Sequence, residues 1–455
     1  MPPRALAWAA QAGGVELPPL GALVGNEGFR LEAKAVRRLD GAALAVYHWQ
    51  MRNHRTWSIL AVFLTGNAVD AAVATAFAMA VTFPGAGNIG GGGFMVIRLA
   101  SGKATTIDYR ERAPLRSTPA MYLDGKGAID RSLAAEGYLA PATGRSYGRP
   151  DGQPWSAGDT LRLPQLARTL EAIATGGPDA FYRGWIADSL AADMAAHGGI
   201  MTKADLAAYR AVERLPVRGS FLGHEIIPMG PPSSGGTSIL TMLNILERFD
   251  IAHRSPMAAG TLHLMIEAQR RAFLDRAEYL GDVDFGPVPV ARLVSKAHGA
   301  ELARTIDTTK ATSSVALAAG RVPVQPSHES DQTTHFSVVD AAGKRGGKVL
   351  LVTGSPGGRT IINTVHQIIL NVTAFGMDVR QAVDAPRFHS QWLPDMVWLE
   401  PGSLPDSTSA ALKALDHQIR QGGRIDNGHS ILIDPKTGTA FGANDHRSTD
   451  SEASQ

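Results

Sequence analysis

Apolar residues spaced three and four positions apart predict helices in both halves of the chain. The clearest apolar face combines Ile361, Val365, Ile368, Ile369 and Val372, which fall on one side of a helix with about 3.6 residues per turn. The same spacing, bounded by Gly pairs and Pro, predicts further helices over 67–81, 163–197, 203–209, the later part of 231–249, and 258–280.

Period-two alternation predicts strands that pair as hairpins. The predicted strands are FMVIRL (94–99) and ATTIDYR (104–110), segments within 212–229, TTHFSVVD (333–340) and KVLLVTG (348–354) about the turn AAGKRGG, and two strands within 430–445 about a Lys-Thr-Gly turn. Hairpin strands sandwiched by helices indicate a layered α+β fold rather than a doubly wound parallel sheet.

The longest apolar stretch, residues 58–83, is long enough to cross a bilayer. Asn67 and Asp70 lie near its middle and Gly66 interrupts it, and a charged Asp in mid-bilayer costs roughly 3 kcal/mol. We therefore expect a buried helix that begins near Gly66, and no membrane span. The first residues carry one Arg and only a short Ala-rich run, so no secretory signal peptide is visible and location stays open.

The composition excludes several kinds of catalytic chemistry and of partner. The 455 residues include no cysteine, which excludes disulfides, Cys-ligated metals and a thiol nucleophile, and leaves Ser, Thr, Lys or a carboxylate for covalent catalysis. Lys and Arg number 44 against 42 Asp and Glu, and the densest basic stretch, GKRGGK, is short. Nucleic acid is therefore not expected as a partner.

Several familiar motifs are absent or out of context. GAGNIGG (85–91) matches G-x-G-x-x-G in letters, but a helix precedes it and a strand follows, the reverse of a dinucleotide site, so a glycine turn is expected. We find no S-x-x-K, H-E-x-x-H or Walker A motif. His263 and Glu267, four apart on a predicted helix, indicate a solvated face rather than a metal site, so no metal or cofactor is predicted.

The segment ESDQTTHFSVVD (329–340) has the pattern that an N-terminal nucleophile requires. If the chain breaks between Gln332 and Thr333, the new α-amino group, with an ordinary pKa of about 7.7–8.0, can act as base for the Thr333 hydroxyl. The alternative is structural, because Thr pairs also begin strands for reasons of β-propensity.

Three further patterns have both a chemical and a structural interpretation. The SPGGR turn (355–359) could aim backbone N–H groups at a developing negative charge, or be an ordinary turn before a helix. PPSSGG (231–236) could be a capped helix entry or the wall of a polar pocket. Arg110, at a strand end, could clamp a carboxylate or form an ion pair with Glu111 or Asp108.

Together these segments resemble the γ-glutamyltranspeptidase family. The matching motifs, in the family's order, are GNAVDAAVATAFAMAVTFPGAGNIGGGGFMVIRL, IDYRERAP, GGPDAFYRG, TKADLAAY, PPSSGG, EYLGDVDF, ESDQTTHFSVVD, LVTGSPGGRTI and DAPRFHSQWLP. They cover roughly residues 66–131 and 150–447.

The resemblance implies an N-terminal-nucleophile fold, a four-layer αββα sandwich, in a precursor that cuts itself into two subunits. Residues 66–332 would form a large-subunit-like region and 333–455 a small-subunit-like region, after an unmatched segment 1–65. Thr333 would be the nucleophile exposed by cleavage after Gln332.

The same resemblance implies the other roles and partners. Gly357 and Gly358 would supply oxyanion N–H groups, and Arg110 would hold the α-carboxylate of a γ-glutamyl substrate. Glutathione or another γ-glutamyl compound would pass its acyl group to water, an amino acid or a peptide. The partners would be this small molecule and the two fragments of the chain, and family members are commonly periplasmic or extracellular.

The chain also departs from the family pattern. Only 24 positions separate Thr333 from Gly357, where the family carries a longer stretch with a second Thr, a Ser pair and groups that bind the substrate's α-amino group. A second block is missing after SLAAEGYLA (132–140). The sandwich should therefore be incomplete, and two alternatives stay open: an unprocessed or catalytically impaired homologue, and a related amide acylase.

Overall fold

The chain is α+β, as the sequence predicted. The computed structural model describes residues 67–127, 147–149, 151–156, 159–318, 333–345 and 349–447, and the backbone of two short strands, β1 (Leu44–Ala45) and β2 (Ala61–Val62). Gln332, and the region after 132–140 where a block is missing, lie outside the described residues.

Helices occupy the positions that the apolar spacing predicted, and several short ones were not predicted. They are α2 (Ala68–Thr82), α4 (Pro164–Gly176), α5 (Pro178–Tyr182), α6 (Trp185–Ala196), α7 (Lys203–Ala208), α8 (Gly235–Leu246), α9 (Ala259–Tyr279), α10 (Val290–Leu293), α11 (Lys296–Ala303), α12 (Ser314–Leu317), α13 (Ala341–Arg345), α14 (Thr360–Thr373), α15 (Val379–Asp384) and α16 (Asp406–Ala414).

A capping box explains why α2 begins at Ala68. The Asn67 side chain accepts a hydrogen bond from the N–H of Val69 at 2.8 Å, and the Asp70 carboxylate accepts one from the N–H of Asn67 at 2.9 Å. The two polar residues that argued against a membrane span thus start a helix. Across the described part of the chain, none of the helices combines the length and the apolar character needed to cross a bilayer.

The strands form small sheets. They are β3 (Phe94–Arg98), β4 (Ala104–Asp108), β5 (Val212–Arg214), β6 (Gly219–Phe221), β7 (His224–Ile226), β8 (Leu351–Gly354), β9 (Phe388–His389), β10 (Val397–Leu399), β11 (Ile419–Gln421), β12 (His429–Ile433) and β13 (Ala440–Ala443). The order is β3-β4-β5, β6-β7, β11-β10-β9 and β13-β12-β8, with antiparallel pairs except for β10 and β11.

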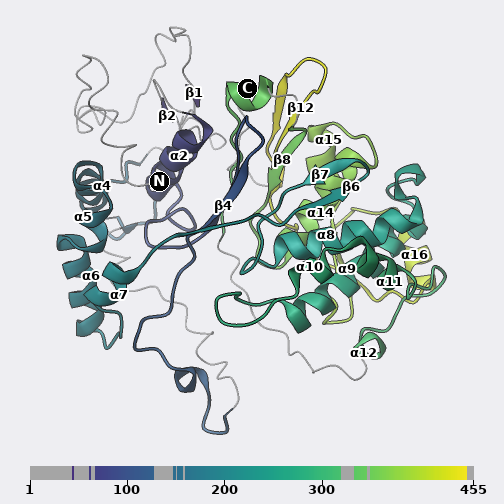
Figure 1. Cartoon of the computed structure of the whole chain (residues 1–455), viewed down its shortest axis with the longest axis horizontal. Coiled ribbons are helices and arrows are strands. Elements are labelled where there is room, and N and C mark those ends of the chain that lie inside the picture. The colour runs from purple at the N-terminus through teal and green to yellow at the C-terminus, as the bar shows by residue number, and fades with distance from the viewer. Residues whose placement is uncertain are drawn as a thin grey trace.

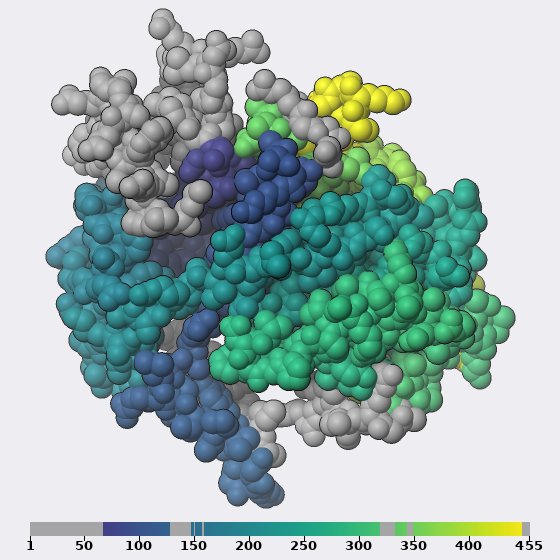
Figure 2. All heavy atoms as spheres, in the orientation of Figure 1, coloured from purple at the N-terminus to yellow at the C-terminus, as the bar shows by residue number. Residues whose placement is uncertain are grey.

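The main core lies on one side of the molecule. Helices α8, α9 and α14 pack there below β8 and β12, whereas α4 to α7 lie on the opposite side (Figure 1). In the space-filling view, the teal chain between α7 and α8 crosses the face between these two sides (Figure 2). Met242, Leu243, Ile266 and Leu370 are fully buried in this core, which supports the residues that follow β8.

Two predictions for the region around residue 340 were wrong. Residues 333–340 form no strand, and 341–345, predicted as a turn, are the short helix α13. Alternation produces a strand only where a neighbouring backbone completes a ladder. Within the described residues β8 pairs with β12 alone, and segment 333–340 is held by side-chain contacts instead.

Candidate active site

The segment that begins at Thr333 lies against the end of β8. Gly354, the last residue of β8, has no side chain, and a Cβ there would overlap the imidazole ring of His335. Ser337 Oγ, which lies 3.1 Å from His335 Nε2, donates to the carbonyl oxygen of His429 at 3.3 Å. Burial lowers the pKa of His335 to about 3, so the partly exposed ring is neutral and packs as an anchor against the end of β8. Thr333, two positions before this anchor, is half-buried.

The SPGG turn follows β8 directly. Gly357 and Gly358 have φ angles of +118° and +62°, in the region that favours glycine. A Cβ at Gly357 would also overlap the carboxylate of Asp426. Both the backbone conformation and the close approach therefore require glycine at this point, and the turn leads straight into α14.

The structure thus brings together two of the predicted site elements. Gly354 contacts His335 and is followed by the turn, so the Thr333 segment and the Gly357–Gly358 pair meet at the end of β8. A segment that begins with a threonine and a glycine turn that leads into α14 therefore adjoin the same end of β8.

Arg110 lies at the end of β4 and is exposed. Its Nε is 3.4 Å from the Glu111 carboxylate and its guanidinium lies 5.5 Å from the ring centre of Phe94. Asp108, the other acid considered from the sequence, binds Arg214 at 2.9 Å instead. Arg110 therefore makes the ion pair with Glu111 that the structural interpretation predicted.

The sequence analysis missed Asp426 and the buried groups that hold its loop. Arg387 donates to the carbonyl oxygens of Ile425 and Asp426 at 2.8 and 3.2 Å, and Arg387 also forms an ion pair with Asp445. Burial raises the pKa of Asp426 to about 6. No sequence signal links this Asp to the turn, because 66 positions separate it from Thr360.

Replacing Gly357 with alanine is expected to destabilise the protein by about 3 kcal/mol, because strain at positive φ adds to the overlap with Asp426. Gly376→Ala is the matched control: its φ is +64°, but nothing lies within 4 Å of the point where the new methyl group would sit, so about 1 kcal/mol is expected. Urea unfolding midpoints measure both. Equal losses of stability in Gly357→Ala and Gly376→Ala would show that Asp426 does not constrain the turn.

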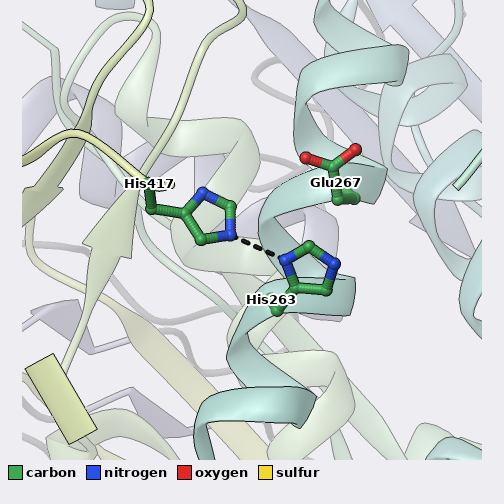
Figure 3. Close-up of side chains that lie close together, drawn as sticks. All are labelled: His263, Glu267 and His417. Carbon is green, nitrogen blue, oxygen red and sulfur yellow. Dashed lines mark hydrogen bonds between the residues drawn. The ribbon is translucent and has the colours of Figure 1, made fainter. Parts of the chain in front are cut away.

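The prediction that His263 and Glu267 lie on a solvated helix face was wrong. Both are fully buried on α9, which is covered by α8 and α16, rather than on a solvated face. His417 lies beside them, with its Nε2 2.8 Å from His263 Nδ1 (Figure 3). Glu267 turns away from this pair to Arg270 and Arg271, which hold its pKa below the usual value despite burial.

These contacts disfavour a metal at the cluster, although three possible ligands lie close together. Glu267 also accepts from the N–H and hydroxyl of Thr312, so its oxygens are already satisfied. A divalent cation would add two charges next to Arg270 and Arg271 in a buried site, at a large desolvation cost. The cluster is better explained as a structural network.

Comparison with known proteins identifies the family. The family model described as gamma-glutamyltranspeptidase matches residues 58–144, 129–345 and 344–454. The chain is 36% identical to the glutathione hydrolase proenzyme of Escherichia coli (strain K12), over 85% of this chain and 87% of the relative. It is 30% identical to the Acylase ACY 1 proenzyme of Pseudomonas sp. (strain SE83), over 83% and 88%.

Solved structures agree at the level of fold. The Helicobacter pylori gamma-glutamyltranspeptidase shares 34% identity and a TM-score of 0.53, covering 56% of this chain and 89% of the other. A cephalosporin acylase from Bacillus halodurans, at 22% identity, has a TM-score of 0.66 and covers 84% of this chain and 90% of the other.

The matches also locate missing segments. The alignment with the Escherichia coli protein spans 510 positions, whereas 85% of 455 residues is about 387, so about 123 positions have no counterpart here. The family model breaks near 129–144 and 344–345, next to the two places where the sequence indicated missing blocks. With motifs, glycine turn and matches in agreement, this chain belongs to the γ-glutamyltranspeptidase family.

Proposed function

We propose that this chain is a self-processing γ-glutamyl hydrolase and transferase. The observation that carries the proposal is the contact between the Thr333 segment and the end of β8, immediately before the Gly357–Gly358 turn. Cleavage would give two fragments, residues 1–332, which include the large-subunit-like region 66–332, and residues 333–455, within an incomplete αββα sandwich. Glutathione and related γ-glutamyl amides are the proposed substrates, in keeping with the names of the relatives.

The proposed reaction begins with self-cleavage. Cleavage of the Gln332–Thr333 peptide bond frees the α-amino group of Thr333, which takes the hydroxyl proton as the oxygen attacks the γ-carbonyl carbon. The N–H groups of Gly357 and Gly358 stabilise the oxyanion. The C–N bond then breaks, the amine leaves with the proton, and an ester with Thr333 remains.

Water or an amine then attacks this ester, and the products are glutamate or a new γ-glutamyl amide. Arg110 would pair with the substrate's α-carboxylate. The family groups that take the α-amino charge are missing, so we expect weak binding and a high KM, because loosely held substrates lose reactive geometry.

Two measurements test the proposal. On a denaturing gel, the purified chain of 48.1 kDa should separate into two fragments, with Thr333 as the first residue of the smaller one by N-terminal sequencing. The processed protein should then release the anilide from a γ-glutamyl anilide. A single uncut band would favour the unprocessed alternative instead.

A second candidate function is amide acylase activity, favoured by the similarity to the Acylase ACY 1 proenzyme and by the lost α-amino pocket. Hydrolysis of an antibiotic side-chain amide by the cleaved protein, without turnover of the γ-glutamyl anilide, would establish it.

A further inference from the structure

Asp426 brings a carboxyl group to the glycine turn from a distant loop. Its Oδ1 bonds the hydroxyl of Thr360, the first residue of α14, and its Oδ2 accepts from the hydroxyl of Thr364 at 2.9 Å. Its side chain also fills the space beside Gly357. Asp426 and Thr364 lie outside the motifs that revealed the family.

The protonation state of Asp426 determines which oxygen receives the hydroxyl hydrogen of Thr360. The Thr360 hydroxyl lies 2.6 Å from the carbonyl oxygen of Gly357 and also contacts Asp426 Oδ1. A hydroxyl has one hydrogen, and a carbonyl oxygen can only accept. If Thr360 donates to Gly357, the proton between Thr360 and Asp426 must come from the carboxyl group. A protonated Asp426 therefore lets the Thr360 hydroxyl bond to Gly357, whose carbonyl oxygen also accepts from the Thr360 N–H at 3.3 Å, whereas an ionised Asp426 takes the hydroxyl hydrogen for itself.

The surroundings favour the neutral acid. Burial is the main cause that raises the pKa of Asp426 to about 6, and Asp445 adds to it. Hydrogen bonds from Thr360 and Thr364 and the charge of Arg387 act in the opposite direction. Arg387 is itself ion-paired with Asp445 and reaches only the backbone oxygen of Asp426.

We propose that protonated Asp426 is a positioning residue of the SPGG turn, which fixes the Gly357 carbonyl through Thr360 and thereby orients the N–H groups of Gly357 and Gly358. The inference rests on the proposed function, since these N–H groups matter for turnover only if they bind an oxyanion. A neutral acid suits this place, because an ionised carboxylate against Gly357 would oppose the developing negative charge.

The kinetic test compares variants of the cleaved full chain. Asp426→Asn supplies an N–H that can donate to Thr360 at every pH. The kcat of the wild type for γ-glutamyl anilide should fall as pH rises through about 6, and this limb should be absent in Asp426→Asn. Asp426→Ala and Thr360→Val should lower kcat by roughly 10- to 100-fold with KM little changed, and Thr360→Ser should restore it. A limb that persists in Asp426→Asn would overturn the proposal.

A second readout does not depend on turnover. A carboxyl whose pKa is raised by folding, here from 3.8 to about 6, stabilises the fold at low pH and loses this contribution as pH rises through about 6. Relative to Asp426→Asn, the wild-type Tm should therefore fall between about pH 4 and pH 7. Asp416→Asn is the matched control and should follow the wild type, because Asp416 is exposed, faces a lysine and also has a positive φ, +67° against +52° for Asp426.

The two readouts separate the possible failures. A Tm difference between wild type and Asp426→Asn that stays constant with pH overturns the proposal, whether or not the chain is active. The protein could instead show a Tm difference that changes with pH but neither self-cleavage nor turnover. That result supports protonated Asp426 and overturns the proposed function.

Discussion

Thr333→Ala is expected to leave one uncut chain of 48.1 kDa with no γ-glutamyl transfer activity. The substitution removes the hydroxyl that attacks both the Gln332–Thr333 peptide bond and the substrate, so processing and turnover are lost together. Loss of a covalent nucleophile typically lowers kcat by roughly 10⁶-fold, which here means activity below detection.

Two control variants make this result specific. Thr333→Ser keeps the hydroxyl and loses only a methyl group. We expect it to cleave still, but more slowly. Thr334→Ala changes the neighbouring threonine and should cleave at the original bond. Surviving turnover in Thr333→Ala, or cleavage there at the same bond, would refute the assignment of the nucleophile.

Glu267→Gln is expected to cost about 3–5 kcal/mol of the free energy of unfolding. The carboxylate is fully buried and bonds Arg270, Arg271 and Thr312, so an amide leaves two buried guanidinium groups without their main counter-charge. For a protein of ordinary stability this is a large share of the total. Urea unfolding followed by circular dichroism measures the effect.

The control for this prediction is an exposed pair on a helix. Asp179 lies 3.0 Å from Arg183, one turn away, with both side chains at least about half exposed. Asp179→Asn should barely move the unfolding midpoint, because solvent screens such pairs. If Glu267→Gln and Asp179→Asn shift the unfolding midpoint equally, the α9 network contributes no more to stability than a surface contact.

The same network connects the two proposed fragments. Arg270 on α9 binds Asp395 at 2.9 Å, and the Trp392 indole donates to the carbonyl of Ser314 at 2.8 Å. Both contacts cross from the region before Gln332 to the region after Thr333. Because they are largely buried, we expect the fragments to co-elute after cleavage on size-exclusion chromatography.

Some features follow from sequence because their causes are local. The α2 start depends on Asn67 and Asp70, three positions apart, and the paired β12 and β13 depend on a short turn at 434–438. The glycine turn before α14 was visible because positive φ angles select glycine. Such signals need no knowledge of the rest of the fold.

Other features could not be predicted because their partners are remote. His263 and Glu267 looked like a solvated face because α9 is rich in charged residues, yet its neighbours bury it on all sides. Alternation at 333–340 suggested a strand, but a strand depends on a neighbouring ladder that the described residues lack.

By itself the sequence determined the α+β class, most helices, the absence of thiol chemistry and the motifs centred on Thr333 and the SPGG turn. Only the tertiary structure decided what surrounds them: His335 against Gly354, and Asp426 against Gly357. Short-range hydrogen bonds and backbone sterics depend on residues that are close together in the sequence. Burial and protonation are set by groups that meet only when the chain is folded, as Thr360 and Asp426 do.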